Sequence, residues 1–113
     1  MINNSIKTDL RGKNAPLITP DFLDSVGFDV NSQYDSETNL TLLFYDIEIR
    51  SFKVSLYYEH LLTLEEMVIF KEKNQLPGHK FELYVNHIKL NVFEYEDEIK
   101  VFCLLLGYAL SIK

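Results

Sequence analysis

The side chains that most often carry out chemistry in proteins are few in this sequence and stand far apart. The three histidines, His60, His79 and His87, have no cysteine or carboxylate at the spacing of a metal-binding motif. Glu59 precedes His60, but adjacent strand residues point to opposite faces, so the two could not share a metal if the strand extends that far. We expect each histidine to be a loop or strand-end residue, and we predict no metal site and no cofactor.

The only cysteine, Cys103, stands in the most apolar run of the chain, at residues 101–106. A thiol becomes a good nucleophile where an exposed, electropositive setting lowers its pKa. The neighbours Phe102 and Leu104 predict the opposite, a buried structural thiol. A single cysteine excludes an internal disulfide, which fits a reducing, cytoplasmic location.

An acidic run at residues 94–98 could supply a pair of carboxylates for general acid–base catalysis. The start of a helix explains the same run, because carboxylates there accept hydrogen bonds from unpaired backbone amides and offset the helix dipole. The glycines are scattered, so the sequence has no glycine-rich phosphate-binding loop. We therefore assign no catalytic residue, and a small enzyme with a carboxylate site is an alternative. The acids of this run are Glu94, Glu96, Asp97 and Glu98.

The charge balance limits the partners that the protein can have. The 113 residues carry 11 lysines and arginines against 17 aspartates and glutamates, a formal net charge of −6. This excess opposes non-specific attraction to nucleic acid or to anionic membranes. No apolar run is long enough to cross a bilayer, and residues 1–14 lack the apolar core of a secretory signal. We expect neither nucleic acid nor a membrane as a partner.

The acidic residues are concentrated in one part of the chain. Seven carboxylates and no basic residue lie between Thr19 and Glu48, which is typical of a solvated surface and also suits binding to a basic protein. Exposed tyrosines among them would add contact area at low entropic cost. If a helix covers the second face of the sheet, the same rings belong to the core instead. The binding residues that we predict are Tyr34, Asp35, Glu37, Tyr45, Asp46, Glu48 and Tyr57.

Both ends of a short first helix are encoded around residues 19–28. Thr19 suits the N-cap because its hydroxyl accepts from a first-turn amide, and Pro20 has the helical φ at the next position. Gly27 ends the helix in a left-handed conformation. The apolar side of this helix consists of Phe22, Leu23 and Val26, with Phe28 at the exit.

The middle of the chain alternates between apolar and polar residues. Residues 31–39 are polar and turn-like, and alternation over residues 40–58 predicts two antiparallel strands. Even-numbered residues face the core in both strands, which puts Tyr45 and Tyr57 on the opposite face. The simplest interpretation places the turn between the two strands near residues 46–49. Because this segment has no glycine, the alternative is a first strand that runs unbroken through Ile49.

The segment at residues 63–73 fits either a helix or a strand. Thr63 and Glu66 have the spacing of a capping box, which predicts a helix, whereas the apolar residues 67–70 would also serve as a strand. Beyond a Pro-Gly turn, alternation over residues 81–92 predicts a second hairpin with its turn at Asn86.

The apolar run near the end of the sequence predicts a long helix over residues 97–111. It shows no polar side, so we expect the rest of the fold to surround it. Taken together, the elements predict an α+β domain at residues 15–113. It has an antiparallel sheet of about four strands in two hairpins, a short N-terminal helix, a middle helix and a long buried C-terminal helix. Residues 1–14 have no hydrophobic period and predict a flexible arm.

Residues 17–28, read as Leu-Ile-Thr-Pro-Asp-Phe-Leu-Asp-Ser-Val-Gly-Phe, resemble a helix found in small uncharacterised proteins of phages and mobile elements of gut-type bacteria. Those proteins also end in a hydrophobic helix after alternating strands. The resemblance, with the C-terminal helix included, covers about a quarter of the chain, and its motif is a well-capped helix. The resemblance implies an origin in a mobile element, and it implies no known activity and no functional residue.

These observations favour a protein-binding module that is not an enzyme. We expect another protein, of basic character, as the partner, since an acidic surface steers association with basic molecules. One form of this function is an immunity or inhibitor protein that blocks a basic toxin or nuclease. The alternatives are the small enzyme with a carboxylate site and a structural subunit whose apolar C-terminal helix completes an oligomer.

Overall fold

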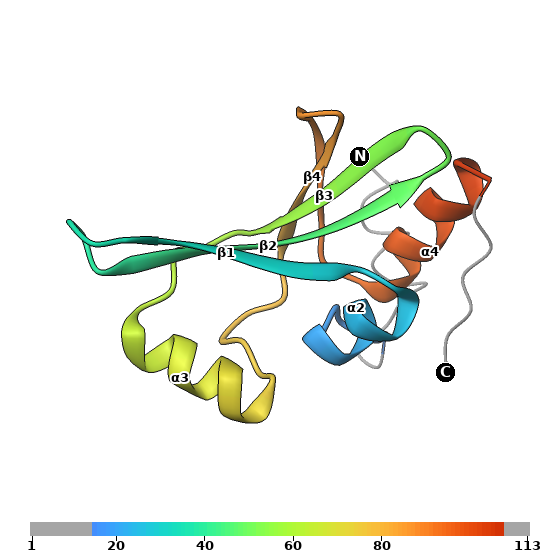
Figure 1. Cartoon of the computed structure of the whole chain (residues 1–113). Coiled ribbons are helices and arrows are strands. Elements are labelled where there is room, and N and C mark those ends of the chain that lie inside the picture. The colour runs from blue at the N-terminus through green and yellow to red at the C-terminus, as the bar shows by residue number, and fades with distance from the viewer. Residues whose placement is uncertain (1–14, 108–113) are drawn as a thin grey trace, which may run out of the picture.

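Within residues 15–107, five antiparallel strands pair in the order in which they follow one another along the chain, β1-β2-β3-β4-β5, and form one sheet. The computed structural model describes residues 15–107 of the 113 (Figure 1). The elements are α2 (Pro20–Val26), β1 (Asp29–Asp35), β2 (Leu40–Ile49), β3 (Phe52–Tyr58), α3 (Leu64–Lys73), β4 (Phe81–Val85), β5 (Ile88–Phe93) and α4 (Glu96–Leu105).

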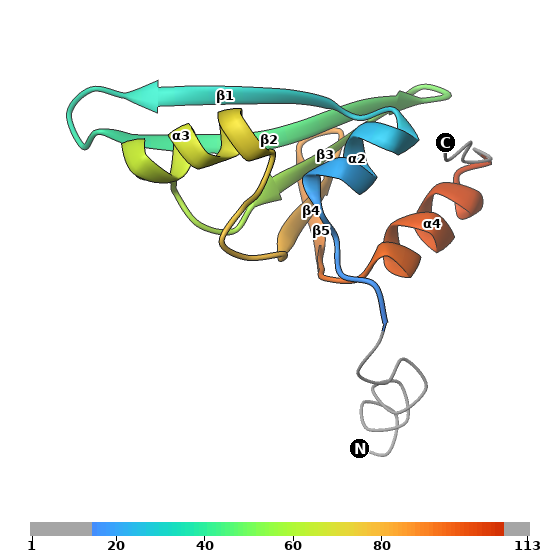
Figure 2. The ribbon, with the colours of Figure 1, turned by 90° about the horizontal axis from the view of Figure 1, so that it is seen from below.

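All three helices of residues 15–107 lie on the same face of the sheet, and no helix of this described range lies on the opposite face (Figures 1 and 2). The hydrophobic core fills the space between the helices and the sheet. The prediction of an α+β fold with helices on one face of an antiparallel sheet is therefore confirmed. The largest fully buried side chains of this core are Tyr45, Phe81, Ile18, Leu23, Leu43, Ile49, Leu56, Leu62, Leu83 and Ile99.

Helix α2 begins and ends as its sequence predicts. The Thr19 hydroxyl accepts a hydrogen bond from the Phe22 amide at 3.1 Å. Gly27 has a φ of 104°, and the Phe28 amide donates to the Leu23 carbonyl across the end of the helix. The apolar side of α2 is buried, so local capping and core packing agree on the position of this helix.

The segment at residues 63–73 is a helix, which decides between the two alternatives. The Glu66 amide donates to the Thr63 hydroxyl, and the Thr63 amide donates to a Glu66 carboxylate oxygen, which completes the capping box. Asn74 ends α3 with a φ of 54° and donates from its side chain to Asp21 and Asp24 of α2. This amide joins the end of one helix to the other.

Strand β1 overlaps the segment that the sequence predicts to be turn-like, so that prediction is wrong for residues 31–35. All seven residues of β1 are exposed, and hydrophobic alternation therefore gives no sign of the strand. The strand forms because its backbone pairs with β2 in an uninterrupted register from Asp29–Asp46 to Asp35–Leu40.

Strand β2 runs unbroken to Ile49, as in the second of the two alternatives, and the turn to β3 lies at Arg50 and Ser51. Arg50 adopts the left-handed conformation, with a φ of 58°, in place of a glycine. In β3 the even-numbered residues from Val54 face the core as predicted. In β2 the assignment is wrong, because the odd-numbered residues are buried.

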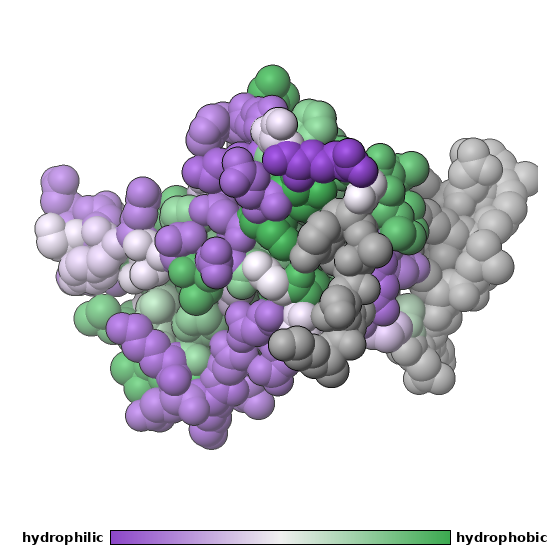
Figure 3. Space-filling view, turned by 45° about the vertical axis from the view of Figure 1, so that its right-hand side comes forward, coloured by the Kyte–Doolittle hydropathy of each residue, from purple (hydrophilic) through white to green (hydrophobic). Residues whose placement is uncertain are grey.

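Strands β4 and β5 form the predicted second hairpin. Asn86 and His87 at its turn both have positive φ values, 50° and 71°, which match the right-handed twist of the strands. Hydrophobic side chains reach the surface at the top of the molecule, where this hairpin projects (Figure 3). Ile88, at the start of β5, is the most exposed apolar residue of the hairpin.

Helix α4 is buried on one side only, so the prediction of a helix surrounded by the fold is wrong for the described residues. Ile99 and Cys103 face the core, while Val101, Leu104 and Leu105 are 55, 62 and 79% exposed. The helix ends at Leu105, and the predicted residues 108–111 of it lie outside the described range, as does the arm at residues 1–14. No helix among residues 15–107 has the length and apolar character needed to cross a membrane.

Candidate functional site: the uncovered face of the sheet

A row of three aromatic rings crosses the uncovered face of the sheet, the face on which no helix of the described residues lies. Phe44 of β2 lies directly opposite Tyr57 of β3, and their rings stack with centroids 4.9 Å apart and an interplanar angle of 17°. Tyr84 of β4 sits diagonally next to Tyr57, and these rings meet edge to face at 5.0 Å. Strand register thus places three rings from three strands in continuous contact.

The aromatic row, Phe44, Tyr57 and Tyr84, is half-buried, although no secondary-structure element of the described chain covers it. Leu42 of β2 and Val92 of β5 extend the apolar surface at either side. Single apolar residues on a surface are ordinary, whereas a large contiguous apolar patch is a candidate binding surface. This row is the largest group of aromatic side chains outside the core of residues 15–107.

Carboxylates outnumber basic groups around the aromatic row. Asp46, Glu48 and Glu82 point from β2 and β4 to this face, according to the strand register. Lys89 of β5 forms an ion pair with Glu82, with Nζ and Oε2 3.3 Å apart, and Lys53 lies opposite Glu48. The row therefore has an acidic border.

Asp46 lies two residues from Phe44 along β2, on the same face of the sheet. Its Oδ2 accepts a hydrogen bond from the side-chain Nδ2 of Asn31 at 3.2 Å, and its buried Oδ1 has no hydrogen-bond partner among the described residues. Asp29 of β1 lies directly opposite, so two carboxylates face one another across the strands, an arrangement that costs energy. Burial raises the pKa of Tyr57, and the negative charge of Asp46 raises it further.

The structure brings together only part of the predicted binding residues. Tyr57, Asp46 and Glu48 share the uncovered face with the aromatic row. Asp35 and Glu37 lie at the turn between β1 and β2, where the Asp35 carboxylate accepts from the Glu37 amide. Tyr34 is exposed on the helix side of β1, and its hydroxyl donates to the side chain of Asn39 at 2.6 Å.

Tyr45 lies in the core, so the prediction that its ring faces away from the core is wrong. The side chain is fully buried and its ring meets Phe81 edge to face. Its hydroxyl has no hydrogen-bond partner among the described residues. Burial raises its pKa, and the nearby charges of Asp24 and Asp21 add to the increase. The other possibility, that a helix covers the tyrosines, holds for this residue.

Two members of the row, Phe44 and Tyr84, were not among the predicted binding residues. Both sides of β2 read as apolar in the sequence, so periodicity could not distinguish the core side from the outer side. The signal that could have identified the row is Tyr57 itself. In a two-stranded pairing with the turn at Arg50, Phe44 falls opposite this half-buried tyrosine.

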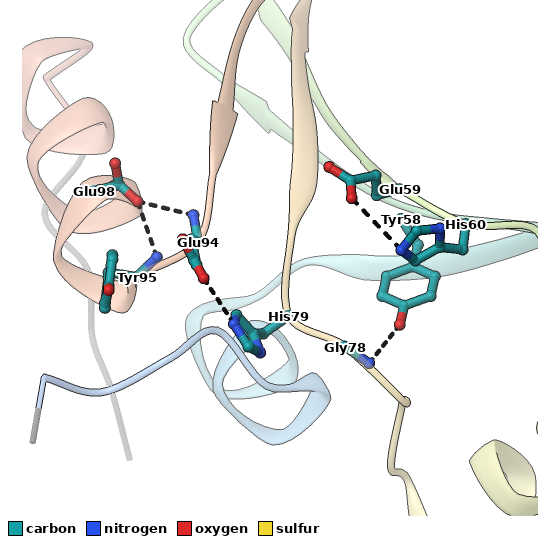
Figure 4. A network of polar contacts seen from close by, with 8 residues as sticks. All are labelled: Tyr58, Glu59, His60, Gly78, His79, Glu94, Tyr95 and Glu98. Atoms are coloured by element: carbon teal, nitrogen blue, oxygen red, sulfur yellow. Dashed lines mark hydrogen bonds and ion pairs between the residues drawn. The ribbon is translucent and has the colours of Figure 1, made fainter. Parts of the chain in front are cut away.

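The acidic run at residues 94–98 serves to hold the start of α4 in place (Figure 4). One oxygen of Glu98 accepts from the amides of Glu94 and Tyr95, at 2.8 and 2.9 Å. The Glu94 carboxylate contacts His79 Nε2 at 2.8 Å, and Glu96 lies 3.8 Å from Lys100. Glu98 thus caps the start of α4, as the helix-start interpretation of the run predicts, and Glu94 and Glu96 are ion-pair partners.

The histidines lie in loops or turns, as predicted. Strand β3 ends at Tyr58, so Glu59 and His60 lie beyond the strand and need not point to opposite faces. Their side chains are 3.5 Å apart, from Glu59 Oε1 to His60 Nε2 (Figure 4). The neighbouring Tyr58 hydroxyl accepts from the Gly78 amide at 2.6 Å. Among residues 15–107 no group of three or more histidine, cysteine or acidic side chains could hold a metal ion.

Cys103 is fully buried in the core, as its apolar neighbours predict. Burial raises the pKa of its thiol to about 11, because the protein interior disfavours the thiolate. The thiol is thus neither accessible nor activated, and it packs as a small apolar side chain.

Comparison with known proteins yields no match, whether with a family model, a curated protein or a solved structure. The resemblance of residues 17–28 to phage and mobile-element proteins stays a prediction. The geometry of the uncovered face is what supports a function for this chain.

Proposed function

We propose that this protein binds another protein through the uncovered face of its sheet and that the partner presents basic side chains to it. The aromatic row of Phe44, Tyr57 and Tyr84 carries this proposal, because it exposes contiguous apolar area on the one face that the helices leave open. Aromatic rings held in contact lose little further freedom on binding, so they make efficient contact residues.

The acidic border of the row supports a basic partner. An arginine or lysine of the partner would lie over a ring while its charge meets Asp46 or Glu48, which combines a cation–π contact with a charge pair. The formal net charge of −6 would also speed the encounter with a basic protein. A toxin or nuclease bound by its inhibitor or immunity protein is one form of such a complex, and the resemblance to mobile-element proteins agrees with it.

A nucleic-acid partner is less well supported, although aromatic residues on an open sheet also stack bases in some proteins. Such sheets combine their rings with positive charge that follows the phosphate backbone. Here carboxylates border the row, and one of the two nearby lysines is paired with Glu82. We propose a cytoplasmic location for the complex, since the lone cysteine suits a reducing environment.

Affinity capture from a lysate of the source organism, with nuclease treatment in parallel, tests this function. The tagged protein should retain one stoichiometric protein that survives nuclease treatment. Tyr57→Ala and Glu48→Lys should each lose most of it, because they remove a ring and reverse a charge on the binding face. Glu72→Lys is the matched control, since it makes the same charge change on the exposed side of α3.

Two results would contradict the proposed function. In the first, no protein is captured at a stoichiometric level. In the second, the captured protein is retained by Tyr57→Ala and Glu48→Lys as well as by the control.

A second candidate function is that of an oligomer subunit, which the apolar surface of α4 favours. Val101 and Leu105 border a cavity of about 360 Å³ between α4 and β5, so exposed apolar side chains surround a hollow in the surface. Light scattering at micromolar concentration tests this function. A monomer would exclude the oligomer, and an oligomer dissociated by Leu105→Glu would support it.

A further inference from the structure

The two edges of the sheet differ in how well they are protected against a further strand. At one edge, β5 carries a lysine and its pairing with β4 is interrupted by a register shift between Leu83 and Tyr84. A bulge and an edge lysine are the devices by which proteins discourage unwanted strand pairing. At the other edge, β1 has neither device.

Strand β1 is a regular strand whose outer edge is unpaired among residues 15–107. It is seven residues long, contains no proline, glycine or lysine, and keeps one register with β2 along its whole length. Figure 2 shows it as the outermost strand of the sheet. Every second residue of such a strand directs its amide and carbonyl away from the sheet, where an added strand can bond to them.

A carboxylate lies at each end of the β1 edge. The register places Asp29 and Asp35 on the uncovered face, six residues or about 20 Å apart. Neither carboxylate forms an ion pair with another described residue. The outer end of the β1–β2 hairpin is hydrophilic, as seen at the left of Figure 3.

This charge pattern disfavours a second copy of the chain as the added strand. Full-length antiparallel pairing of two β1 strands centres on Ser32 and sets Asp29 of each copy opposite Asp35 of the other. Like charges would then oppose one another at both ends, which destabilises a strand pair. A strand with basic residues at both positions would instead place opposite charges together.

We propose that an extended segment of the partner protein pairs with the outer edge of β1 as a sixth strand and carries lysine or arginine opposite Asp29 and Asp35. The inference rests on the proposed function and specifies how the basic partner is recognised. The two basic residues are six positions apart. The second and sixth positions of the segment are apolar, because they face Val30 and Tyr34 on the helix side of β1.

A synthetic peptide tests this recognition on the full chain. The probe is the blocked peptide Gly-Lys-Val-Thr-Ser-Thr-Val-Lys-Gly, whose pattern is the same in both directions and so allows parallel or antiparallel pairing. At about 1 mM peptide, NMR spectra of the ¹⁵N-labelled protein should show shift changes centred on residues 29–35, with slower exchange of the outward-facing amides. The matched control is the same peptide with both lysines replaced by glutamate, which should not bind.

The double variant Asp29→Asn, Asp35→Asn tests the role of charge. Asparagine at position 35 keeps an oxygen that can accept from the Glu37 amide, so the turn is preserved. Affinity for the lysine peptide should fall about five- to tenfold, and that loss should shrink at high salt. The inference is overturned if the lysine peptide leaves β1 unchanged, if the glutamate peptide binds equally well, or if the shift changes lie at β5.

The outcomes separate this inference from the proposed function. Suppose that a partner is captured, that its capture depends on Tyr57, and that the lysine peptide does not bind β1. This result would contradict the pairing of a sixth strand and would still support binding through the uncovered face. An empty capture would remove the proposed function whatever the peptide does.

Discussion

At the scale of single residues, Tyr45 combines full burial with a hydroxyl that no described residue hydrogen-bonds. A buried polar group without a partner costs about 1–3 kcal/mol, so this hydroxyl lowers the stability of the fold. We predict that Tyr45→Phe leaves the free energy of unfolding unchanged or raises it by up to about 1 kcal/mol, as measured by urea unfolding.

Tyr58→Phe is the matched comparison for this prediction. The Tyr58 hydroxyl accepts from the Gly78 amide, so its removal leaves a partly buried donor unpaired. The free energy of unfolding should fall by about 1–2 kcal/mol. A larger loss in Tyr45→Phe than in Tyr58→Phe would contradict both assignments.

Cys103 makes stability depend on alkaline pH. Burial raises the pKa of the thiol to about 11 in the folded protein, from its ordinary value of 9.0 in the unfolded chain. Between these values the unfolded state has lost a proton that the folded state keeps, so the free energy of unfolding falls as pH rises from 9 to 11, by about 2–3 kcal/mol. The raised pKa of Tyr58 adds to the loss above pH 10.

Urea unfolding at several pH values between 8 and 11 measures this dependence. In Cys103→Ala the decline with pH should be shallower, even though the smaller side chain lowers stability at pH 8. An equally steep decline in that variant would assign the pH dependence to other groups.

At the scale of elements, Asn74 contributes to stability in two ways. It holds a left-handed backbone at the end of α3, and its side chain donates to Asp21 and Asp24 of α2. Asn74→Gly keeps the backbone conformation and loses the hydrogen bonds, while Asn74→Ala loses both. We predict that alanine costs about 1 kcal/mol more than glycine in thermal or urea unfolding. Equal losses would show that the backbone conformation contributes nothing here.

The elements that the sequence predicts well are those whose signals are local. The caps of α2 and α3 depend on residues three or four positions apart, so Thr19, Gly27, Thr63 and Glu66 could be interpreted without the rest of the fold. Strand β1 depends on its pairing with β2 and buries no side chain, so its residues carry no such signal. The burial of only one side of α4 likewise depends on how much of the helix packs against the sheet, which local sequence does not indicate.

At the scale of the whole molecule, stability should be greatest in the middle of the sheet. Strands β2 and β3 are paired on both sides and contribute Leu43, Val54 and Leu56 to the core, while β1 contributes no buried residue. We predict that native-state hydrogen exchange is slowest for amides of β2 and β3 and fastest in β1. Exchange in β1 as slow as in β3 would contradict this, unless a bound partner is present.

The fold class could be predicted, because the hairpin signals and helix caps allow few arrangements of the elements. The helices must also bury their apolar sides against a face of the sheet. The candidate site could be predicted only in part. The types and charges of Tyr57, Asp46 and Glu48 predict them as binding residues. Predicting the face that they share with Phe44 requires knowing which side of β2 faces the core. Because both sides of β2 are apolar, the packing of the helices decides which side faces the core.

The order of the strands has a kinetic consequence. Because every strand pairs with its neighbour in the chain, most contacts of the sheet span short loops, and such contacts form quickly. The backbone contacts between residues 16–18 and 94–96, such as the Ile18 amide with the Glu94 carbonyl, span most of the described chain and bear the largest entropic cost of closure. We expect them to close after the barrier to folding is crossed, so a substitution there would speed unfolding and leave the folding rate nearly unchanged.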